Sequence, residues 1–340
     1  MSDSILLSPL QIGSITVNNR LVMPPMATFK GEDDRFTEEV LQYYKEKTDG
    51  GAIGLAIVEH CYVSPEGKAH PGQISISEDG AIPGLKTLAD IFHKNGSKAL
   101  VQISHAGAKS SPKFTGFPVK GAGDIVLNRD GDVPEPFTKE ELETLAERFA
   151  AAALRAQKAG FEGIELHSAH GYLLSQFLSP LANNRTDEYG GTIENRARLH
   201  TEIIKAIREA CGKDFVIAVR LGAADYVKDG PDPAEGGLTP EEGVRAAVLC
   251  EEAGADLIDV SGGLYGTERK DYPGTAMFTD ISHKIREAVT IPVAVVGRIT
   301  TASQCNAILN DGDADLVGAA AALLKDSDWA KNIIRESLEG

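Results

Sequence analysis

The segment that decides the fold reads Gly163-Ile164-Glu165-Leu166-His167-Ser168-Ala169-His170-Gly171-Tyr172. It begins as a short apolar run, typical of a strand buried on both faces, and ends in a turn that carries two histidines and a tyrosine. A long amphipathic stretch precedes it, opened by a capping box at Thr138 and stopped at Ala159-Gly160. A helix followed by a buried strand is the repeating unit of an α/β fold.

The same unit recurs along the chain, and Thr239 followed by Pro240 marks the start of another helix. Apolar runs predict eight strands: Leu21–Met23, Leu55–Glu59, Ala99–Ser104, Gly163–His167, Val216–Leu221, Leu257–Ser261, Val293–Val296 and Asp315–Val317. Eight such units favour a (β/α)8 TIM barrel. An open doubly wound sheet is the alternative, although no G-x-G-x-x-G follows the first strand, as dinucleotide-binding sheets require.

Two segments lie outside the repeating pattern. In Gln11–Val17, apolar and polar residues alternate on either side of Gly13-Ser14. This pattern predicts a short N-terminal hairpin that plugs the barrel. Residues Ser110–Val133 are rich in glycine and proline and predict an excursion after the third strand. We expect this excursion and the loop Tyr265–Phe278 to shape a substrate pocket. Since no low-complexity linker divides the chain, residues 1–340 are expected to form one domain.

Composition excludes several classes of protein. The 340 residues carry a formal net charge of −16, which opposes binding to nucleic acid or to anionic membranes. Four cysteines lie far apart with no C-x-x-C, which argues against an iron–sulfur cluster, a structural zinc site or a disulfide framework. The first residues do not form a signal peptide, and no apolar run could span a membrane. A cytoplasmic location is therefore expected.

Barrel active sites lie where the strands end, and the strand at residues 163–167 ends in an unusual set of side chains. His167 and His170 could donate two N–H groups to one carbonyl oxygen, and Tyr172 could then deliver a proton. The two histidines could equally be ordinary polar residues of a turn. A zinc site would need a third ligand, and the H-x-x-H spacing is not that of H-E-x-x-H, so no metal is predicted.

Other strand ends supply groups suited to a flat ring and an anion. Arg220, at a strand end, must pair with a barrel carboxylate or hold an electron-accepting ring. Gln102 offers both a donor and an acceptor, as the pyrimidine edge of a flavin requires, unless it is merely solvated. Glycines after the last two strands, Gly297 and Gly318, fit the usual phosphate site of a barrel or are ordinary turn residues.

These residues stand in longer blocks that together resemble one known family. The blocks are Leu7–Gly13, Asn19–Met26, Val101–Gly107, Gly163–Pro180, Asn184–Gly191 and Glu194–Arg196. Over essentially its whole length the chain resembles the Old Yellow Enzyme family of flavin oxidoreductases. The resemblance implies a TIM barrel with non-covalent FMN at the carboxyl ends of its strands.

The resemblance also assigns a role to individual residues. The catalytic residues would be His167, His170 and Tyr172. The cofactor-binding residues would be Pro24, Pro25, Met26, Ala27, His60, Gln102, Arg220, Gly297, Arg298, Ala320 and Ala321. The backbone of the first four would wrap the flavin, Gln102 and Arg220 would bind its pyrimidine end, and the last four would lie at its phosphate.

The reaction implied by the resemblance is reduction of the activated C=C bond of an α,β-unsaturated carbonyl compound. NADH or NADPH would reduce the flavin; hydride would then pass from flavin N5 to the β-carbon and a proton from Tyr172 to the α-carbon. The partner is a small molecule, and relatives often form homo-oligomers. The alternatives are a flavin-poor barrel that binds ligands without efficient turnover and a non-flavin barrel lyase or metal enzyme.

Three positions depart from the family pattern. Ala27 stands where relatives often carry threonine or cysteine at the O4–N5 edge of the flavin, so a shifted flavin potential is expected. Ala321 replaces an arginine that would bind the phosphate, and Arg298 could supply that charge instead. Ala108 replaces an arginine after His-Ala-Gly, and two missing cations predict weaker FMN retention.

Overall fold

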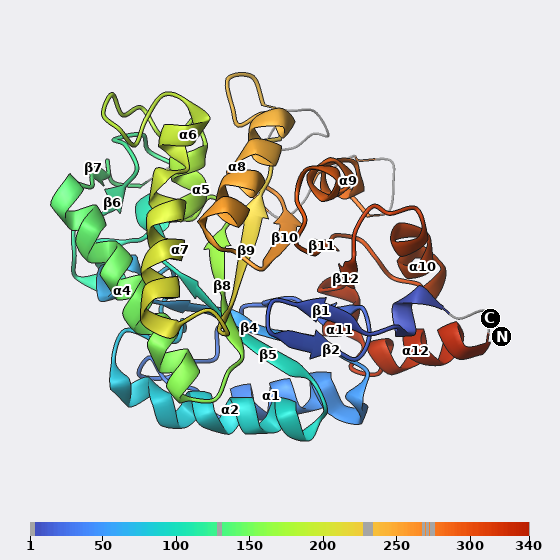
Figure 1. The fold of residues 1–340 in the computed structure, drawn as a ribbon. Coiled ribbons are helices and arrows are strands. Elements are labelled where there is room, and N and C mark those ends of the chain that lie inside the picture. Colours follow the sequence, from blue (N-terminus) through green and yellow to red (C-terminus); the bar gives the residue numbers. More distant parts are fainter. Residues whose placement is uncertain are drawn as a thin grey trace.

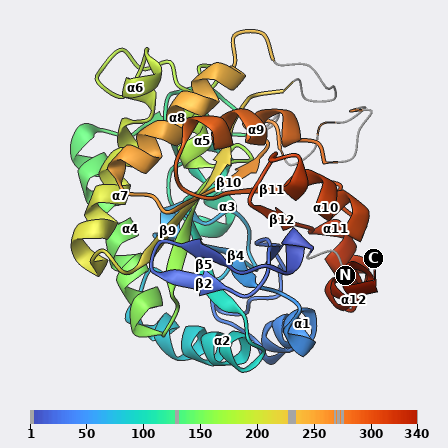
Figure 2. The ribbon, with the colours of Figure 1, turned by 45° about the vertical axis from the view of Figure 1, so that its right-hand side comes forward.

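A computed structural model describes residues 4–127, 131–226, 234–266, 269, 272 and 276–339. Within these residues, eight parallel strands close into a barrel, which confirms the predicted fold (Figures 1 and 2). In order around the barrel they are β3 (Leu21–Met23), β4 (Leu55–Tyr62), β5 (Lys98–Ser104), β8 (Gly163–Ser168), β9 (Val216–Gly222), β10 (Leu257–Ser261), β11 (Val293–Val296) and β12 (Leu316–Gly318). Every residue of β4, β8 and β9 is buried, as strands covered on both faces require.

Helices surround the barrel because each parallel strand needs a crossover to reach the next (Figure 1). The longer ones are α1 (Glu38–Thr48), α2 (Ile82–Lys94), α4 (Lys139–Lys158), α7 (Arg198–Cys211), α8 (Pro240–Ala253), α9 (Thr279–Ala288), α10 (Ala302–Asn310) and α12 (Trp329–Glu339). Both predicted helix starts are confirmed, since Thr138 and Thr239 form capping boxes with Glu141 and Glu242. No helix of the described residues is long and apolar enough to cross a membrane.

The N-terminal hairpin closes one end of the barrel, as predicted. Strands β1 (Leu10–Ile12) and β2 (Ile15–Val17) pair antiparallel across Gly13, which has φ +51°. Ile12, Ile15 and Val17 form a separate apolar cluster with residues near the amino ends of the barrel strands, among them Leu55, Val216 and Leu316. The blue hairpin lies across this end in both views, so the opposite, carboxyl end of the barrel is the one available for a ligand (Figures 1 and 2).

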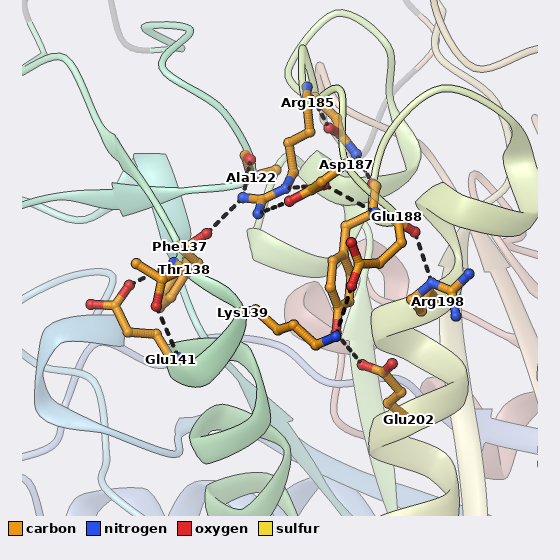
Figure 3. Close-up of polar contacts among 12 residues, drawn as sticks. Ala122, Phe137, Thr138, Lys139, Glu141, Arg185, Asp187, Glu188, Arg198 and Glu202 are labelled. Carbon is orange, nitrogen blue, oxygen red and sulfur yellow. Dashed lines mark hydrogen bonds and ion pairs between the residues drawn. The ribbon is translucent and has the colours of Figure 1, made fainter.

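The excursion after β5 carries a short helix, α3 (Pro112–Thr115), and the strand β6 (Lys120–Gly121), which pairs with β7 (Glu135–Pro136). Arg185 anchors it to the loop after β8 (Figure 3). Its guanidinium donates to the carbonyls of Ala122 and Phe137, at 3.2 and 2.7 Å, and grips both carboxylate oxygens of Asp187. This clamp ties both ends of the excursion to the segment that follows α5 (Leu173–Leu178).

Candidate active site

A cavity of about 480 Å³ lies at the carboxyl ends of the barrel strands. It brings together nearly all of the predicted site residues: Pro25, Met26, Ala27, His60, Gln102, His167, His170, Tyr172, Arg220, Gly297, Arg298, Ala320 and Ala321. Pro24 is the exception, because it follows β3 directly and is buried below the lining. Residues that are far apart in the sequence therefore meet in one cavity, as barrel geometry requires.

The turn after β8 has an unusual backbone that aims its side chains into this cavity. His170 has φ +59° and Gly171 φ +74°, so two consecutive residues adopt the left-handed conformation. A Cβ atom on Gly171 would lie 2.5 Å from both the Leu264 carbonyl oxygen and Lys109 Nζ, so only glycine fits there. Lys109 Nζ donates to the His170 carbonyl at 2.6 Å, which holds the turn.

The predicted catalytic side chains lie next to one another in the cavity lining. The ring centroids of His167 and His170 lie 5.0 Å apart at 84°, and those of His167 and Tyr172 lie 4.8 Å apart. His60 completes the cluster at 5.1 Å from the Tyr172 ring. His170 Nε2 lies 2.7 Å from the Ser261 hydroxyl, which orients the imidazole. This arrangement can present two imidazoles and one phenol to a single small molecule.

Burial sets the protonation of this cluster. Desolvation, together with Arg220 and Lys109 nearby, holds the pKa of both His167 and His170 well below the usual range. Burial by itself raises the pKa of Tyr172 above its usual value. At neutral pH the two rings are therefore neutral, each with one N–H donor, and the phenol keeps its proton. These are the states that carbonyl binding and proton donation require.

Gln102 and Arg220 lie at the floor of the cavity, each bonded to a buried carboxylate. Arg220 Nη1 donates to Asp259 Oδ2 at 2.7 Å, and Gln102 Nε2 donates to Glu165 Oε2 at 2.7 Å. Arg220 is thus paired with a barrel carboxylate, which was one of the two predictions for this residue. Its Nε is buried without a hydrogen-bond partner in the described structure, which suits a ligand acceptor at the floor.

His60 is fixed from behind. Its Nδ1 lies 3.0 Å from Gln73 Nε2 and 3.3 Å from the Ser104 hydroxyl. Burial lowers the pKa of His60 to about 3, so this ring is also neutral at neutral pH. It contributes an uncharged, immobile edge beside Tyr172.

The other end of the cavity combines small residues with one exposed cation. Gly297 has φ +143° and Arg298 φ +51°, and the Arg298 guanidinium donates to the Tyr272 carbonyl at 3.4 Å. Opposite them, Ala320 and Ala321 begin the short helix α11 (Ala321–Lys325) and leave the backbone accessible. Among the described lining residues the only cations are Arg220, at the floor, and Arg298, at this end.

Two sequence-based interpretations are corrected by the structure, and Thr28, which follows Ala27, is excluded as a substitute for the side-chain group that Ala27 lacks. Ala108 does not line the cavity; it is buried beneath the excursion, with its N–H bonded to Gln176 Oε1, so it is no missing phosphate cation. Thr28 cannot compensate for Ala27, because its hydroxyl and N–H both bind the buried carboxylate of Glu59. The described part of the excursion does not line the cavity but borders a separate groove beside α4, which Phe117 enters.

Sequence reasoning also missed residues that shape the site. Phe29 lines the mouth of the cavity, is 64% exposed and lies 4.2 Å from the His70 ring. Met277, by contrast, lies in loop 265–278, which was expected to shape the pocket, and it lines the cavity. Glu165 and Asp259 bond to Gln102 and Arg220 at the floor of the cavity. The sequence contained a sign of both residues, because a charged residue inside an otherwise apolar barrel strand needs a partner.

Comparison with known proteins assigns the chain to a family. The family model described as NADH:flavin oxidoreductase / NADH oxidase family matches residues 5–338. The chain belongs to this NADH:flavin oxidoreductase family. In the part of the chain that the structure describes, no group of three or more histidine, cysteine, aspartate or glutamate side chains is arranged to hold a metal ion.

Individual members of the NADH:flavin oxidoreductase family and solved structures are similar to the chain. It is 37% identical over 335 residues to an NADH oxidase of Thermoanaerobacter brockii, covering 96% of the chain and 50% of that protein. It is 36% identical to a metal reductase of Desulforamulus reducens, covering 95% and 48%. The chain spans about half the length of these relatives.

Solved structures give the same picture of the fold. A 2-naphthoyl-CoA reductase in complex with 2-naphthoyl-CoA superposes with a TM-score of 0.87 at 25% identity, over 98% of this chain and 52% of that one. Histamine dehydrogenase from Rhizobium sp. 4-9 also gives a TM-score of 0.87, at 26% identity, over 98% and 48%. The barrel is therefore shared with a reductase and a dehydrogenase that are named for different substrates.

Proposed function

We propose that the protein is an FMN-dependent NAD(P)H oxidoreductase that reduces the activated C=C bond of α,β-unsaturated carbonyl compounds. The observation that carries the proposal is the convergence of His167, His170 and Tyr172 in one cavity above Arg220 and Gln102. Membership of the NADH:flavin oxidoreductase family supports a flavin and NADH. NADPH as donor, a cytoplasmic location and a homo-oligomeric state belong to the same proposal.

The residues present fit FMN. Gln102 and Arg220 would hold the pyrimidine end of the ring, where the unpartnered Arg220 Nε can meet an acceptor. The backbone from Pro25 to Ala27 would lie along the ring, and Arg298 with the small residues at Ala320–Ala321 would accept the phosphate. When bound, FMN would supply hydride transfer, which no side chain of the cavity can perform.

The substrate would be activated by neutral donors. One N–H from His167 and one from His170 would bind the carbonyl oxygen and stabilise the enolate-like charge that develops on it. The Tyr172 phenol would then give its proton to the α-carbon. Because the pKa of Tyr172 is raised, the phenol keeps this proton across the neutral range.

A second candidate is a flavin-poor barrel that binds ligands without efficient turnover. It is favoured by Ala321, which leaves the phosphate end with Arg298 as its cation among the described lining residues. A non-flavin lyase is a third candidate, and it would need a catalytic group in place of the ring.

The test is the visible spectrum of the protein after FMN addition and gel filtration. The proposal predicts retained yellow colour that bleaches anaerobically with NADH or NADPH and returns on addition of cyclohexenone. Retained flavin that neither donor bleaches would favour the ligand-binding barrel. Absence of flavin uptake would contradict the proposal outright.

A further inference from the structure

A row of four polar side chains runs beneath the floor of the cavity. The strand register places Gln102 of β5 directly beside Glu165 of β8, and Arg220 of β9 directly beside Asp259 of β10. Their exposed fractions are 2%, 0%, 5% and 0%. Since these side chains are almost wholly buried, their polar atoms must bond to one another or to a ligand.

The hydrogen bonds along this row leave two carboxylate oxygens without a partner among the described residues. Gln102 donates to Glu165 Oε2 and Arg220 donates to Asp259 Oδ2. Glu165 Oε1 and Asp259 Oδ1 are buried and accept no N–H or O–H from any described residue. The two carboxyl groups are within hydrogen-bonding reach of each other. Carboxylate oxygens only accept, so a single proton between the two groups would satisfy both.

We propose that Glu165 is a positioning residue held as a neutral carboxylic acid, which donates its proton to Asp259 and accepts the Gln102 amide. The row then reads Gln102, Glu165, Asp259, Arg220, with every internal hydrogen bond made. The proposal rests on the proposed function in that the ligand it positions is the flavin.

Charge balance supports a neutral Glu165. Arg220 carries one positive charge and its bonded partner Asp259 one negative charge, so the row is balanced only if Glu165 is uncharged. Burial raises the pKa of Glu165 well above the usual range, and the Asp259 charge beside it acts in the same direction. Two adjacent buried carboxylates cannot both ionise without a large cost, and Asp259 keeps the charge because it holds the arginine.

The consequence for the ligand is a fixed pair of binding groups. Because the Gln102 Nε2 is taken by Glu165, the Gln102 carbonyl oxygen is left as an acceptor for the cavity. Because Asp259 takes only one Arg220 nitrogen, the remaining guanidinium N–H groups are left as donors. An acceptor beside a cationic donor matches a ring edge with one N–H and one carbonyl oxygen, as in the pyrimidine of a flavin. Without Glu165 the Gln102 amide could turn over and present its donor instead.

The test compares Glu165→Gln with Glu165→Leu in the FMN-loaded protein. A glutamine at this position can donate to Asp259 and accept from Gln102, so it reproduces the neutral acid; a leucine can do neither. We expect Glu165→Gln to keep the FMN dissociation constant within about twofold and Glu165→Leu to raise it about tenfold or more. The flavin midpoint potential should likewise be retained in the first variant and displaced in the second. If Glu165→Gln displaces both quantities as much as Glu165→Leu, the acid is ionised and the proposal is overturned.

A second measurement detects the proton on Glu165 in protein that contains no flavin. Infrared spectra of the unloaded protein at about pH 8, where an ordinary glutamate is ionised, should contain the C=O stretch of a protonated carboxyl group. This band should shift in D₂O and disappear in Glu165→Gln. Its absence from the wild-type protein would overturn the proposal. Since this measurement needs no FMN, a failure of the proposed function and a failure of this inference can be told apart.

Discussion

At the scale of single residues, the left-handed backbone of His170 decides how the site is built. A non-glycine residue in this conformation costs about 1–3 kcal/mol, and such strain persists only where neighbours hold it. Here Lys109 holds the His170 carbonyl, Gly171 allows the close approach of Lys109, and Ser261 holds the ring. The strained turn is what lets two residues three apart face the same small volume.

Ala27 gives the first prediction at this scale. Since the Thr28 hydroxyl is bound to Glu59, Thr28 does not replace the donor or acceptor that Ala27 lacks. In Ala27→Cys, a new hydrogen bond that favours one redox state by about 1 kcal/mol would move a two-electron midpoint potential by about 20 mV. Spectroelectrochemistry of the FMN-loaded variants measures the shift. Ala27→Val, of similar size but without a polar atom, is the matched control; equal potentials in Ala27→Cys and the wild type would refute the idea.

At the scale of elements, the strands and capped helices were predictable and the loops were not. The predicted bounds of β3, β10 and β11 agree with the structure. In a barrel, a short apolar run between two polar turns can only be a buried strand, so its ends are well defined. The expectation that Ala108 marks a missing phosphate cation was wrong. A family resemblance gives a residue's position in the chain, but not the direction in which a 3-10 turn points its side chain. Gly107–Lys109 forms such a turn and carries Ala108 away from the cavity.

The loops after β11 and β12 carry the second prediction. Arg298→Ala removes the cation at the proposed phosphate end and should weaken FMN binding about tenfold, as expected for an exposed charge-assisted hydrogen bond. Ala321→Arg adds a cation at the start of α11 and should strengthen binding. Fluorescence titration of FMN into the unloaded variants measures both effects.

Arg335→Ala is the matched control for this pair, since Arg335 lies on α12 and bonds only to Asn332 among its described hydrogen bonds. The same loss of affinity in Arg335→Ala and Arg298→Ala would show a general effect of net charge. Unchanged affinity in Arg298→Ala would refute the assignment of Arg298.

At the scale of the whole molecule, the described residues form two separate apolar clusters that stabilise different parts of the barrel. One cluster packs the hairpin against the amino ends of the strands and closes the barrel, and the larger one packs the helices on its outside. The carboxyl end is left for polar side chains. The sequence predicted which residues gather there, since each follows a strand, but not the Glu165–Asp259 row, because contacts across a barrel floor depend on strand register.

Buried histidines give a prediction for the stability of the whole molecule. His200 bonds to Ser168 outside the barrel, and burial lowers its pKa to about 3. In the unfolded chain a histidine titrates near 6.5, so between about pH 6.5 and 3 the unfolded state binds the extra proton and stability falls as pH falls. His200→Gln should reduce this fall by up to about 1.4 kcal/mol per pH unit. Urea unfolding at several pH values measures it, and identical slopes in both proteins would contradict the burial argument.

The central claim is that Tyr172 donates the proton in alkene reduction, and stopped-flow absorbance of Tyr172→Phe tests it most directly. The variant keeps the ring beside His167 and loses only the hydroxyl. We predict that flavin reduction by NADH or NADPH stays within about twofold of the wild-type rate, while reoxidation by cyclohexenone slows about 100-fold or more. Equal loss in both half-reactions, or none in the second, would contradict the account.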